Sequence, residues 1–337
     1  MNYFTKIKTL LLFTLLLATT VRSQTFHFSQ FHAVPMALNP ALTGDMKGPY
    51  RFSANFRSQW VNGGTPYLTG ALGADFHLLK KQIPEGSKWG VGFNILNDQS
   101  NGGGLQNSQI SLSSAYHIKV DEFGDQTFGL GFQGTYHERK INLSELNFED
   151  QFTNQGFINT LPTGEIFSDV NKKYFDINAG VIYNYRNPES GLQLFAGASA
   201  YNLLQSKVAI TNLQNYHLPS RNTEHAGGII PVSQLSDIKF SATYIQMAGA
   251  TNLTVGAAWD YSLDIESATS IILGSWYRVD DAFIPYVGFR SNSFQLGLTY
   301  DATISALKTL SQTRNAYELS FVYMPWNGGN KLGPNWY

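Results

Sequence analysis

The sequence has no cysteine among its 337 residues and little charge, since only 14% of the residues are Asp, Glu, Lys or Arg. A typical soluble domain carries about 25%. Without cysteine the chain cannot form disulfides, thiolate metal sites or a cysteine nucleophile. The formal net charge of -1 argues against a nucleic-acid-binding protein, which usually has a strongly basic surface. The 23 Phe, 18 Tyr and 6 Trp argue against a disordered chain.

Long apolar runs are also missing, with one exception at the start of the chain. There Lys6 and Lys8 precede the apolar run 10–18, and small residues before Gln24 suit a cleavage site. This pattern predicts a secretory signal peptide over residues 1–23. A membrane anchor is the weaker alternative, because the run is shorter than the roughly 20 residues that span a bilayer. Removing Lys6, Lys8 and Arg22 leaves 20 basic and 24 acidic residues, a net charge of -4.

Apolar and polar residues alternate through most of the chain after Tyr50. One clear case is Leu253, Val255 and Ala257, which alternate with Thr254 and Gly256. Such stretches are about as long as the 9 to 11 residues of a tilted membrane-spanning strand. They predict about fourteen strands, at 50–60, 65–76, 88–97, 105–119, 126–138, 174–186, 191–201, 224–231, 237–246, 252–261, 268–277, 282–291, 293–301 and 316–324.

We therefore expect an all-β protein, a transmembrane antiparallel up-and-down β-barrel. Leu296 and Val255 should face lipid and Gln295 the lumen. The longest connections, 139–173, 202–223 and 302–315, all follow odd-numbered strands and should face outward, as in outer-membrane barrels. The stretch 77–87 is long for a periplasmic turn. The alternative fold is a secreted soluble β-sandwich or barrel, but its outer face should carry more charge.

No arrangement of residues predicts catalysis. Gly129, Gly131 and Gly134 match the dinucleotide fingerprint, but an alternating strand runs through them where a helix would be needed. Ser113 and His117 share the polar face of one strand, yet four residues put them roughly 13 Å apart. The seven histidines show no metal-ligand spacing. The acidic pairs Glu149–Asp150 and Asp280–Asp281 should lie in solvated outward loops. We expect no enzymatic activity, no cofactor and no metal.

The segment between the cleavage site and the first strand differs from the rest. Residues 24–49 are apolar and rich in turn residues, and should form a periplasmic segment, followed by the barrel at 50–325 and a tail at 326–337. Its apolar side chains would expose several hundred Å² in water, an area that marks an interaction site. The segment should therefore dock on a partner or plug the barrel mouth. The candidate residues are Phe28, Ser29, Gln30, Phe31, Asn39, Pro40, Ala41 and Gly44.

Those residues carry a family resemblance. The run 28–31 (FSQF) followed by 39–44 (NPALTG) resembles the N-terminal signature of the PorP/SprF outer-membrane proteins of type IX secretion and gliding motility. Supporting similarity lies at 90–98, 114–117, 300–305 and 317–320. The tail from Trp326 to Tyr337 departs from the family pattern.

The resemblance implies a non-enzymatic accessory protein in the outer membrane of a Gram-negative bacterium. Such a protein is needed for export or surface attachment of partner proteins such as adhesins, and works with periplasmic secretion components. From the residues alone, a passive porin or uptake channel stays open as the alternative. A barrel of this width cannot be filled by strand side chains alone, so the lumen is either plugged or conducting.

Overall fold

A computed structural model of the chain describes residues 27–60, 65–80, 82–154, 156–158, 160–162, 164, 171–208, 216–264, 269–304 and 315–325. The predicted signal peptide at 1–23 and the tail at 326–337 lie outside these residues. None of the described helices has the length and hydropathy to cross a bilayer.

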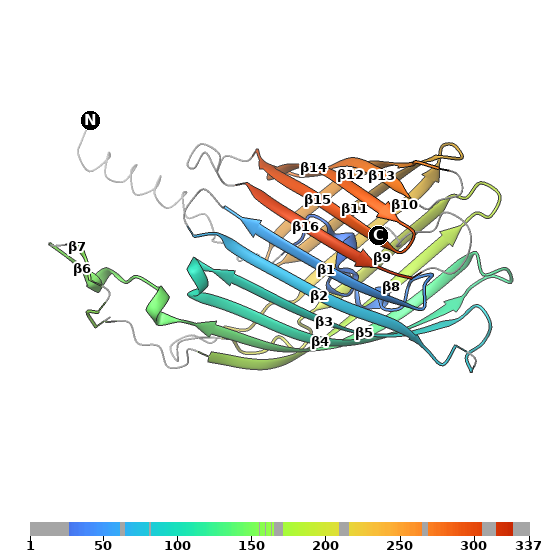
Figure 1. The fold of residues 1–337 in the computed structure, drawn as a ribbon. Coiled ribbons are helices and arrows are strands. Elements are labelled where there is room, and N and C mark those ends of the chain that lie inside the picture. The colour runs from blue at the N-terminus through green and yellow to red at the C-terminus, as the bar shows by residue number, and fades with distance from the viewer. Residues whose placement is uncertain are drawn as a thin grey trace, which may run out of the picture.

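The described chain forms a closed antiparallel barrel (Figure 1). Each strand pairs with the next along the sequence, and β1 closes the barrel by pairing with β16. The barrel strands are β1 (Tyr50–Gln59), β2 (Tyr67–Leu78), β3 (Lys88–Ser100), β4 (Leu105–Lys119), β5 (Gln126–Ile141), β8 (Asn171–Arg186), β9 (Gln193–Tyr201), β10 (Arg221–Pro231), β11 (Ser236–Met247), β12 (Ala250–Ser262), β13 (Ser270–Arg278), β14 (Ala282–Ser291), β15 (Phe294–Thr303) and β16 (Ala316–Tyr323). The predicted fold is confirmed, and each of the fourteen predicted stretches corresponds to one barrel strand.

Side chains alternate across the barrel wall. Leu296 and Val255 are 40% and 39% exposed on the outside, whereas Gln295 is 3% exposed on the inside. This alternation follows from a strand whose successive side chains point to opposite faces. The outer surface is apolar and the inner one polar, which fits a membrane barrel and contradicts a soluble sandwich with a dry core.

The two ends of the barrel differ in their connections. The strand ends that are joined by the longest connections, 142–170, 202–220 and 304–315, lie at one end, on the left in Figure 1. The turns at 120–125, 187–192 and 292–293 lie at the other. Short periplasmic turns and long outward loops are typical of outer-membrane barrels, so we call these ends the outer and the periplasmic end. The connection 79–87 is the longest periplasmic turn, as the sequence predicted.

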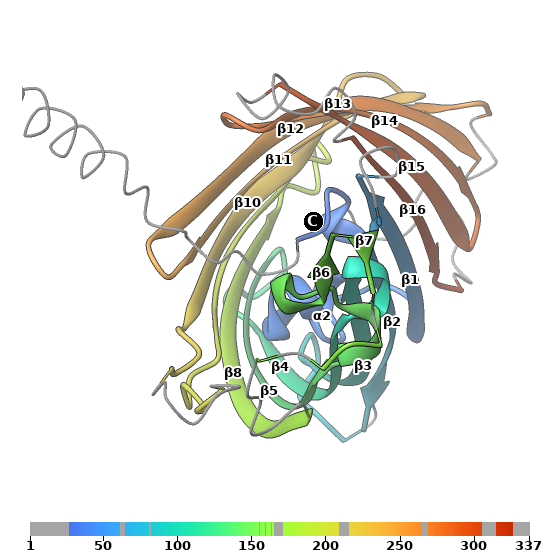
Figure 2. The same ribbon diagram turned by 90° about the vertical axis from the view of Figure 1, so that its left-hand side faces the viewer.

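Small elements lie in the lumen and in the outer loops. The lumen holds η1 (Phe31–Ala33), α2 (Pro35–Leu38) and η2 (Pro40–Leu42), and Figure 2 shows α2 inside the ring of strands. The outer connections contain η3 (Asn101–Gly103), η4 (Leu143–Glu145), η5 (Glu149–Gln151) and the two-stranded sheet of β6 (Phe152–Thr153) and β7 (Gly156–Phe157). This sheet projects beyond the barrel in Figure 1.

Candidate functional site

Residues 28–46, which we call the luminal segment, run through the barrel interior. Every residue of the segment except Ala37 is buried. Ser29 contacts the outer ends of β1, β15 and β16, whereas Gly44 contacts the periplasmic half of β2. The segment therefore descends from the outer end to the periplasmic end, where it turns into β1.

At its outer end the segment is held by buried charges. Glu318 accepts hydrogen bonds from the backbone N–H groups of Ser29 and Gln30, each at 2.8 Å. Arg57 forms ion pairs with Glu318 at 3.0 Å and with Asp301 at 2.7 Å. The Ser29 hydroxyl donates to Asp301 at 2.8 Å. Charge-assisted hydrogen bonds are about twice as strong as neutral ones, so this cluster anchors the start of the segment.

In the middle of the lumen the segment backbone lies directly against the wall. Asn39 donates to the carbonyl of Val181 at 2.9 Å, and its side chain accepts from the N–H of Ala41 at 2.8 Å. A Cβ at Gly131 would meet the backbone of Pro40 and Ala41. Glycine at position 131 leaves the space into which η2 packs.

At the periplasmic end the segment again meets side chains of the wall. The N–H of Gly44 donates to Asp75 at 2.7 Å, and Asp75 also pairs with Arg51 at 2.8 Å. The Thr43 hydroxyl donates to Ser113 at 2.9 Å. Gly44 has φ of +69°, in the left-handed region that glycine adopts without strain.

Apolar side chains of the segment complete the packing. Phe28 is 8% exposed and packs with Val34 and Leu96. Phe31 is 6% exposed and belongs to a larger cluster that includes Leu42 and Trp276. The apolar side chains of the segment thus pack in clusters, and its backbone groups find hydrogen-bond partners on the polar wall of the lumen. Polar backbone groups need such partners once they are buried.

The eight sequence-predicted residues of this site all lie in the luminal segment, and all are buried. The sequence predicted that 24–49 would be a periplasmic segment that docks on a partner or plugs the barrel mouth. Residues 28–46 lie within the barrel, where their apolar side chains and backbone groups find partners. Sequence reasoning did not single out the wall residues that hold the segment: Arg51, Arg57, Asp75, Asp301 and Glu318. The signal that could have identified these wall residues is their charge, because they lie on the polar faces of strands that carry few other charges.

Two cavities flank the luminal segment and share no lining residue. The outer cavity, of about 600 Å³, is lined by polar and aromatic side chains that include His137, Tyr174 and Arg221. The periplasmic cavity, of about 430 Å³, is lined among others by Asp45 and Lys47 at the end of the segment. Both volumes fall in the range of about 300–1,000 Å³ that is usual for ligand pockets.

The remaining sequence motifs occupy structural positions. Gly129, Gly131 and Gly134 lie within β5, which continues as a strand to Ile141. Ser113 and His117 both bind Thr43 of the luminal segment, through the hydroxyl at 2.9 Å and the carbonyl at 3.1 Å.

The acidic pairs lie at the outer end of the barrel. Asp150 accepts from the N–H of Gly164 at 2.7 Å, and Asp281 pairs with Arg278 at 2.9 Å. Across the part of the chain that the structure describes, no three His, Asp or Glu side chains converge as a metal site.

Comparison with solved structures shows the same fold in other barrels. The toluene transporter TbuX of Ralstonia pickettii aligns with a TM-score of 0.51 at 9% identity, over 90% of this chain and 97% of that one. A FadL homologue of Pseudomonas aeruginosa aligns with a TM-score of 0.47 at 11% identity, over 85% and 92% of the two chains. At 9% identity, the likeness to TbuX shows the fold alone.

The sequence matches no curated protein. The sequence profile of the family described as type IX secretion system membrane protein PorP/SprF matches residues 20–323. This match spans nearly the whole barrel and the luminal segment, including the FSQF and NPALTG runs. The closed barrel and this family place the protein in the outer membrane of a Gram-negative bacterium. The chain therefore belongs to the PorP/SprF family of type IX secretion membrane proteins.

Proposed function

We propose that this protein is a non-catalytic part of type IX secretion that holds a secreted or surface-attached partner, such as an adhesin, at its outer end. The observation that carries the proposal is the luminal segment, which occupies the barrel from the outer to the periplasmic end. A barrel filled by its own chain is suited to act as a scaffold. Function in such a scaffold concentrates on the loops that it positions.

The outer loops present apolar side chains to solvent. Phe152 at the start of the projecting β6–β7 sheet is 71% exposed, and Leu203 and Leu204 after β9 are 45% and 52% exposed. Leu203 and Leu204 are adjacent in sequence, and exposed apolar side chains that form a patch mark protein contact sites. The outer cavity lies beside the connection after β9, because Asn202, Tyr216 and Leu218 line it. A partner seated there would contact this connection and the cavity.

The test is to shorten each outer loop in cells that display the partner. Replacing 146–162, or separately 203–217, by a short Gly-Ser linker should leave a heat-modifiable barrel and reduce the amount of partner at the cell surface. Surface labelling of the partner measures the effect. The same replacement of the periplasmic turn 263–269 is the control and should leave display unchanged. Normal display after both outer replacements would refute the proposal.

The alternative function is a passive channel. It is favoured by the likeness in fold to barrels such as TbuX, whose description is that of a toluene transporter. A channel requires the luminal segment to leave the lumen or shift within it. Its many hydrogen bonds to the wall oppose such movement, so we rank the scaffold first.

A further inference from the structure

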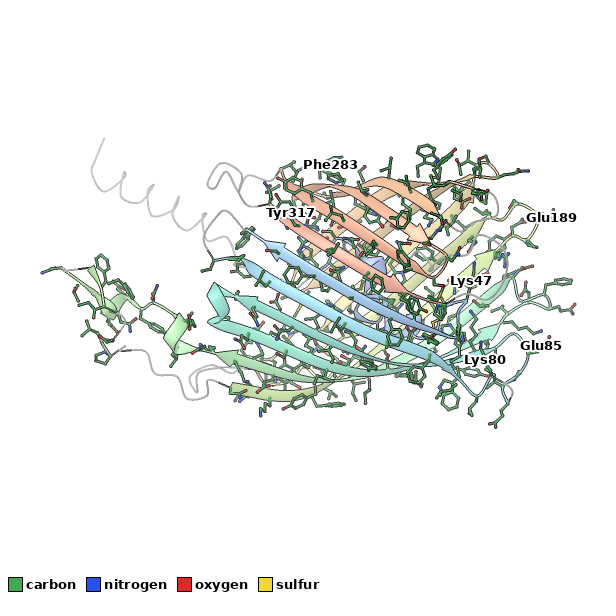
Figure 3. The ribbon with its side chains drawn as sticks, viewed as in Figure 1. Lys47, Lys80, Glu85, Glu189, Phe283 and Tyr317 are labelled. Carbon is green, nitrogen blue, oxygen red and sulfur yellow. The ribbon has the colours of Figure 1, made fainter. Side chains whose placement is uncertain are left out.

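The periplasmic cavity carries a cluster of positive charge. The cavity lies between the end of the luminal segment, the long turn 79–87 and the periplasmic ends of β3, β5, β8 and β9. Lys47, Lys80, Lys88 and Arg186 line it, against the two carboxylates of Asp45 and Asp125. Figure 3 shows Lys47 and Lys80 at this end of the barrel, with the acidic Glu85 and Glu189 on the turns.

Within the described part of the chain, three of these four cations have no ion-pair or hydrogen-bond partner for their side chains. Lys88 lies 3.9 Å from Asp45 and donates to the carbonyl of Met46 at 3.2 Å. Among the described residues, the side chains of Lys47, Lys80 and Arg186 form no ion pair and no hydrogen bond. Burial, together with the charges of Arg186 and Lys88, lowers the pKa of Lys47 to about 8, although Asp45 opposes the shift. The positive charge on Lys47 is therefore held in an environment that a bound anion would relieve.

Lys88 and Arg186 lie on the inner face of their strands. Lys88 shares the face of β3 that carries the buried Gly90 and Asn94, and Arg186 shares the face of β8 that carries Ile182. Lipid headgroups surround the outer wall of a barrel, so an anion that reaches all of these side chains must enter from the periplasm through the barrel mouth. The half-buried Ile83 and Ile229 add an apolar surface to the same cavity.

We propose that the periplasmic cavity binds an acidic segment of a periplasmic protein, with carboxylates on Lys47, Lys80 and Arg186 and an apolar side chain against Ile83 and Ile229. Clusters of cationic side chains are a recurring means of recognising acidic motifs. The volume of about 430 Å³ suits a few residues rather than a folded domain. This inference rests on the proposed function in one respect only, which is that the periplasmic partner takes part in secretion.

In this proposal the long turn 79–87 takes part in binding, because Lys80 and Ile83 of that turn form one wall of the cavity. It also links the periplasmic partner to the lumen. Asp45 and Met46 end the luminal segment, so a ligand that draws Lys88 away from them removes two contacts of that segment.

The test is a binding titration with the purified full-length barrel in zwitterionic detergent. The probe is a fluorescent acetyl-Asp-Glu-Phe-Glu-Asp-amide peptide, and the matched control peptide has Asn and Gln in place of the acids. We expect the acidic peptide alone to bind, with an affinity that falls as salt screens the charges. The double variant Lys47→Gln, Arg186→Gln should weaken binding at least about tenfold, the usual scale for removing charge pairs at an interface.

A matched variant removes the same charge from the other end. Lys140 and Lys173 are exposed beside Glu138 near the outer end, so Lys140→Gln, Lys173→Gln should bind the peptide as the unmodified protein does. Equal binding by both double variants, or no binding of the acidic peptide at all, would overturn the proposal. The proposal would also be overturned if the Lys47→Gln, Arg186→Gln variant lost binding to nanodiscs containing phosphatidylglycerol but bound the acidic peptide normally. That result would assign the site to lipid. Partner display after outer-loop replacement is measured separately, so either proposal can fail while the other stands.

Discussion

At the scale of single residues, the protein uses its few charges inside the lumen. Arg57, Asp301 and Glu318 are each at most 4% exposed at their side chains, yet they form two ion pairs with one another. A buried ion pair contributes little net free energy by itself, but removing one partner leaves an uncompensated charge. The cluster is therefore best understood as a fixed attachment point for the backbone of Ser29 and Gln30.

Replacing Arg57 by Gln should destabilise the barrel strongly. The change leaves Asp301 and Glu318 buried with less positive charge, and breaking a buried pair in this way costs about 3–5 kcal/mol. Urea unfolding of the protein in detergent micelles measures the loss of unfolding free energy. Arg186→Gln is the control, because Arg186 is exposed at the barrel mouth and has no ion pair among the described residues. Similar losses for both variants would argue against the anchoring role.

The pKa of Lys47 gives stability a pH dependence in the alkaline range. Its folded-state pKa of about 8 lies below the unfolded value of about 10.4, so the unfolded chain binds more protons between these values. Stability should therefore rise as pH increases from about 8 to about 10.4, where the destabilising effect of the charge disappears. The causes are burial first, then Arg186 and Lys88.

Lys47→Met should abolish this rise and give a higher melting temperature than the unmodified protein at pH 7. Melting curves of both proteins from pH 7 to pH 11 measure the difference, which should shrink toward the alkaline end. A variant that melts at the same temperature at pH 7, or a difference that grows with pH, would contradict the assigned shift. Lys80→Met, at an exposed position in the same cavity, serves as the comparison.

At the scale of elements, the strands could be predicted and the luminal segment could be only partly predicted. The ranges 105–119 and 282–291 agree with β4 and β14 to the residue, because lipid on one side and a polar lumen on the other impose strict alternation. The luminal segment has no such period. Its aromatic content indicated burial, but the place of burial depends on contacts such as Asn39 with Val181, 142 residues apart.

The wall residues of the site were hidden for the same reason. Arg57 and Asp301 are separated by 244 positions in sequence, and nothing in one sequence pairs them. Glycine offered a second signal that was not recognised. Gly90, Gly131 and Gly180 lie on the inner face of their strands, where a Cβ would meet Gly44, Pro40 or Asn39 of the luminal segment. Glycines on the inner face of a wide barrel thus mark where another chain segment packs.

Gly131→Ala should separate the luminal segment from its wall. The added methyl group has no space beside the backbone of Pro40 and Ala41, and overpacking of this kind costs about 1–3 kcal/mol. Thermal unfolding measures the loss. Gly70→Ala is the matched control in β2, since a Cβ there meets nothing within 4 Å, and it should leave stability unchanged or slightly higher. Equal melting temperatures for the two variants would mean that η2 does not pack against β5 as described.

At the scale of the whole molecule, the barrel is wide enough to conduct and yet contains part of its own chain. Barrels of eight strands are filled by their own side chains, whereas those of 16 to 18 strands leave an aqueous channel. This barrel falls between these classes, so a segment other than the strands decides whether the lumen is open. The segment meets the wall at both ends and in the middle, and an outer and a periplasmic cavity lie on either side of it.

Electrical recordings in planar bilayers can test whether the luminal segment closes the barrel. We expect the unmodified protein to give no stepwise ion current, because the luminal segment lies in the lumen and is bonded to the wall through residues such as Asn39 and Gly44. Replacing residues 28–44 by a flexible Gly-Ser linker should open the lumen and produce discrete current steps. Loss of the segment also exposes Glu318 and Asp75, so the open barrel should favour cations or anions according to which buried charges remain unpaired.

A second variant covers the case in which the longer replacement fails to fold. Ser29→Ala, Asn39→Ala keeps the segment while removing two of its side-chain anchors, and should give brief, infrequent openings. Steady current through the unmodified protein would show that the segment does not close the lumen and would favour the channel function over the scaffold.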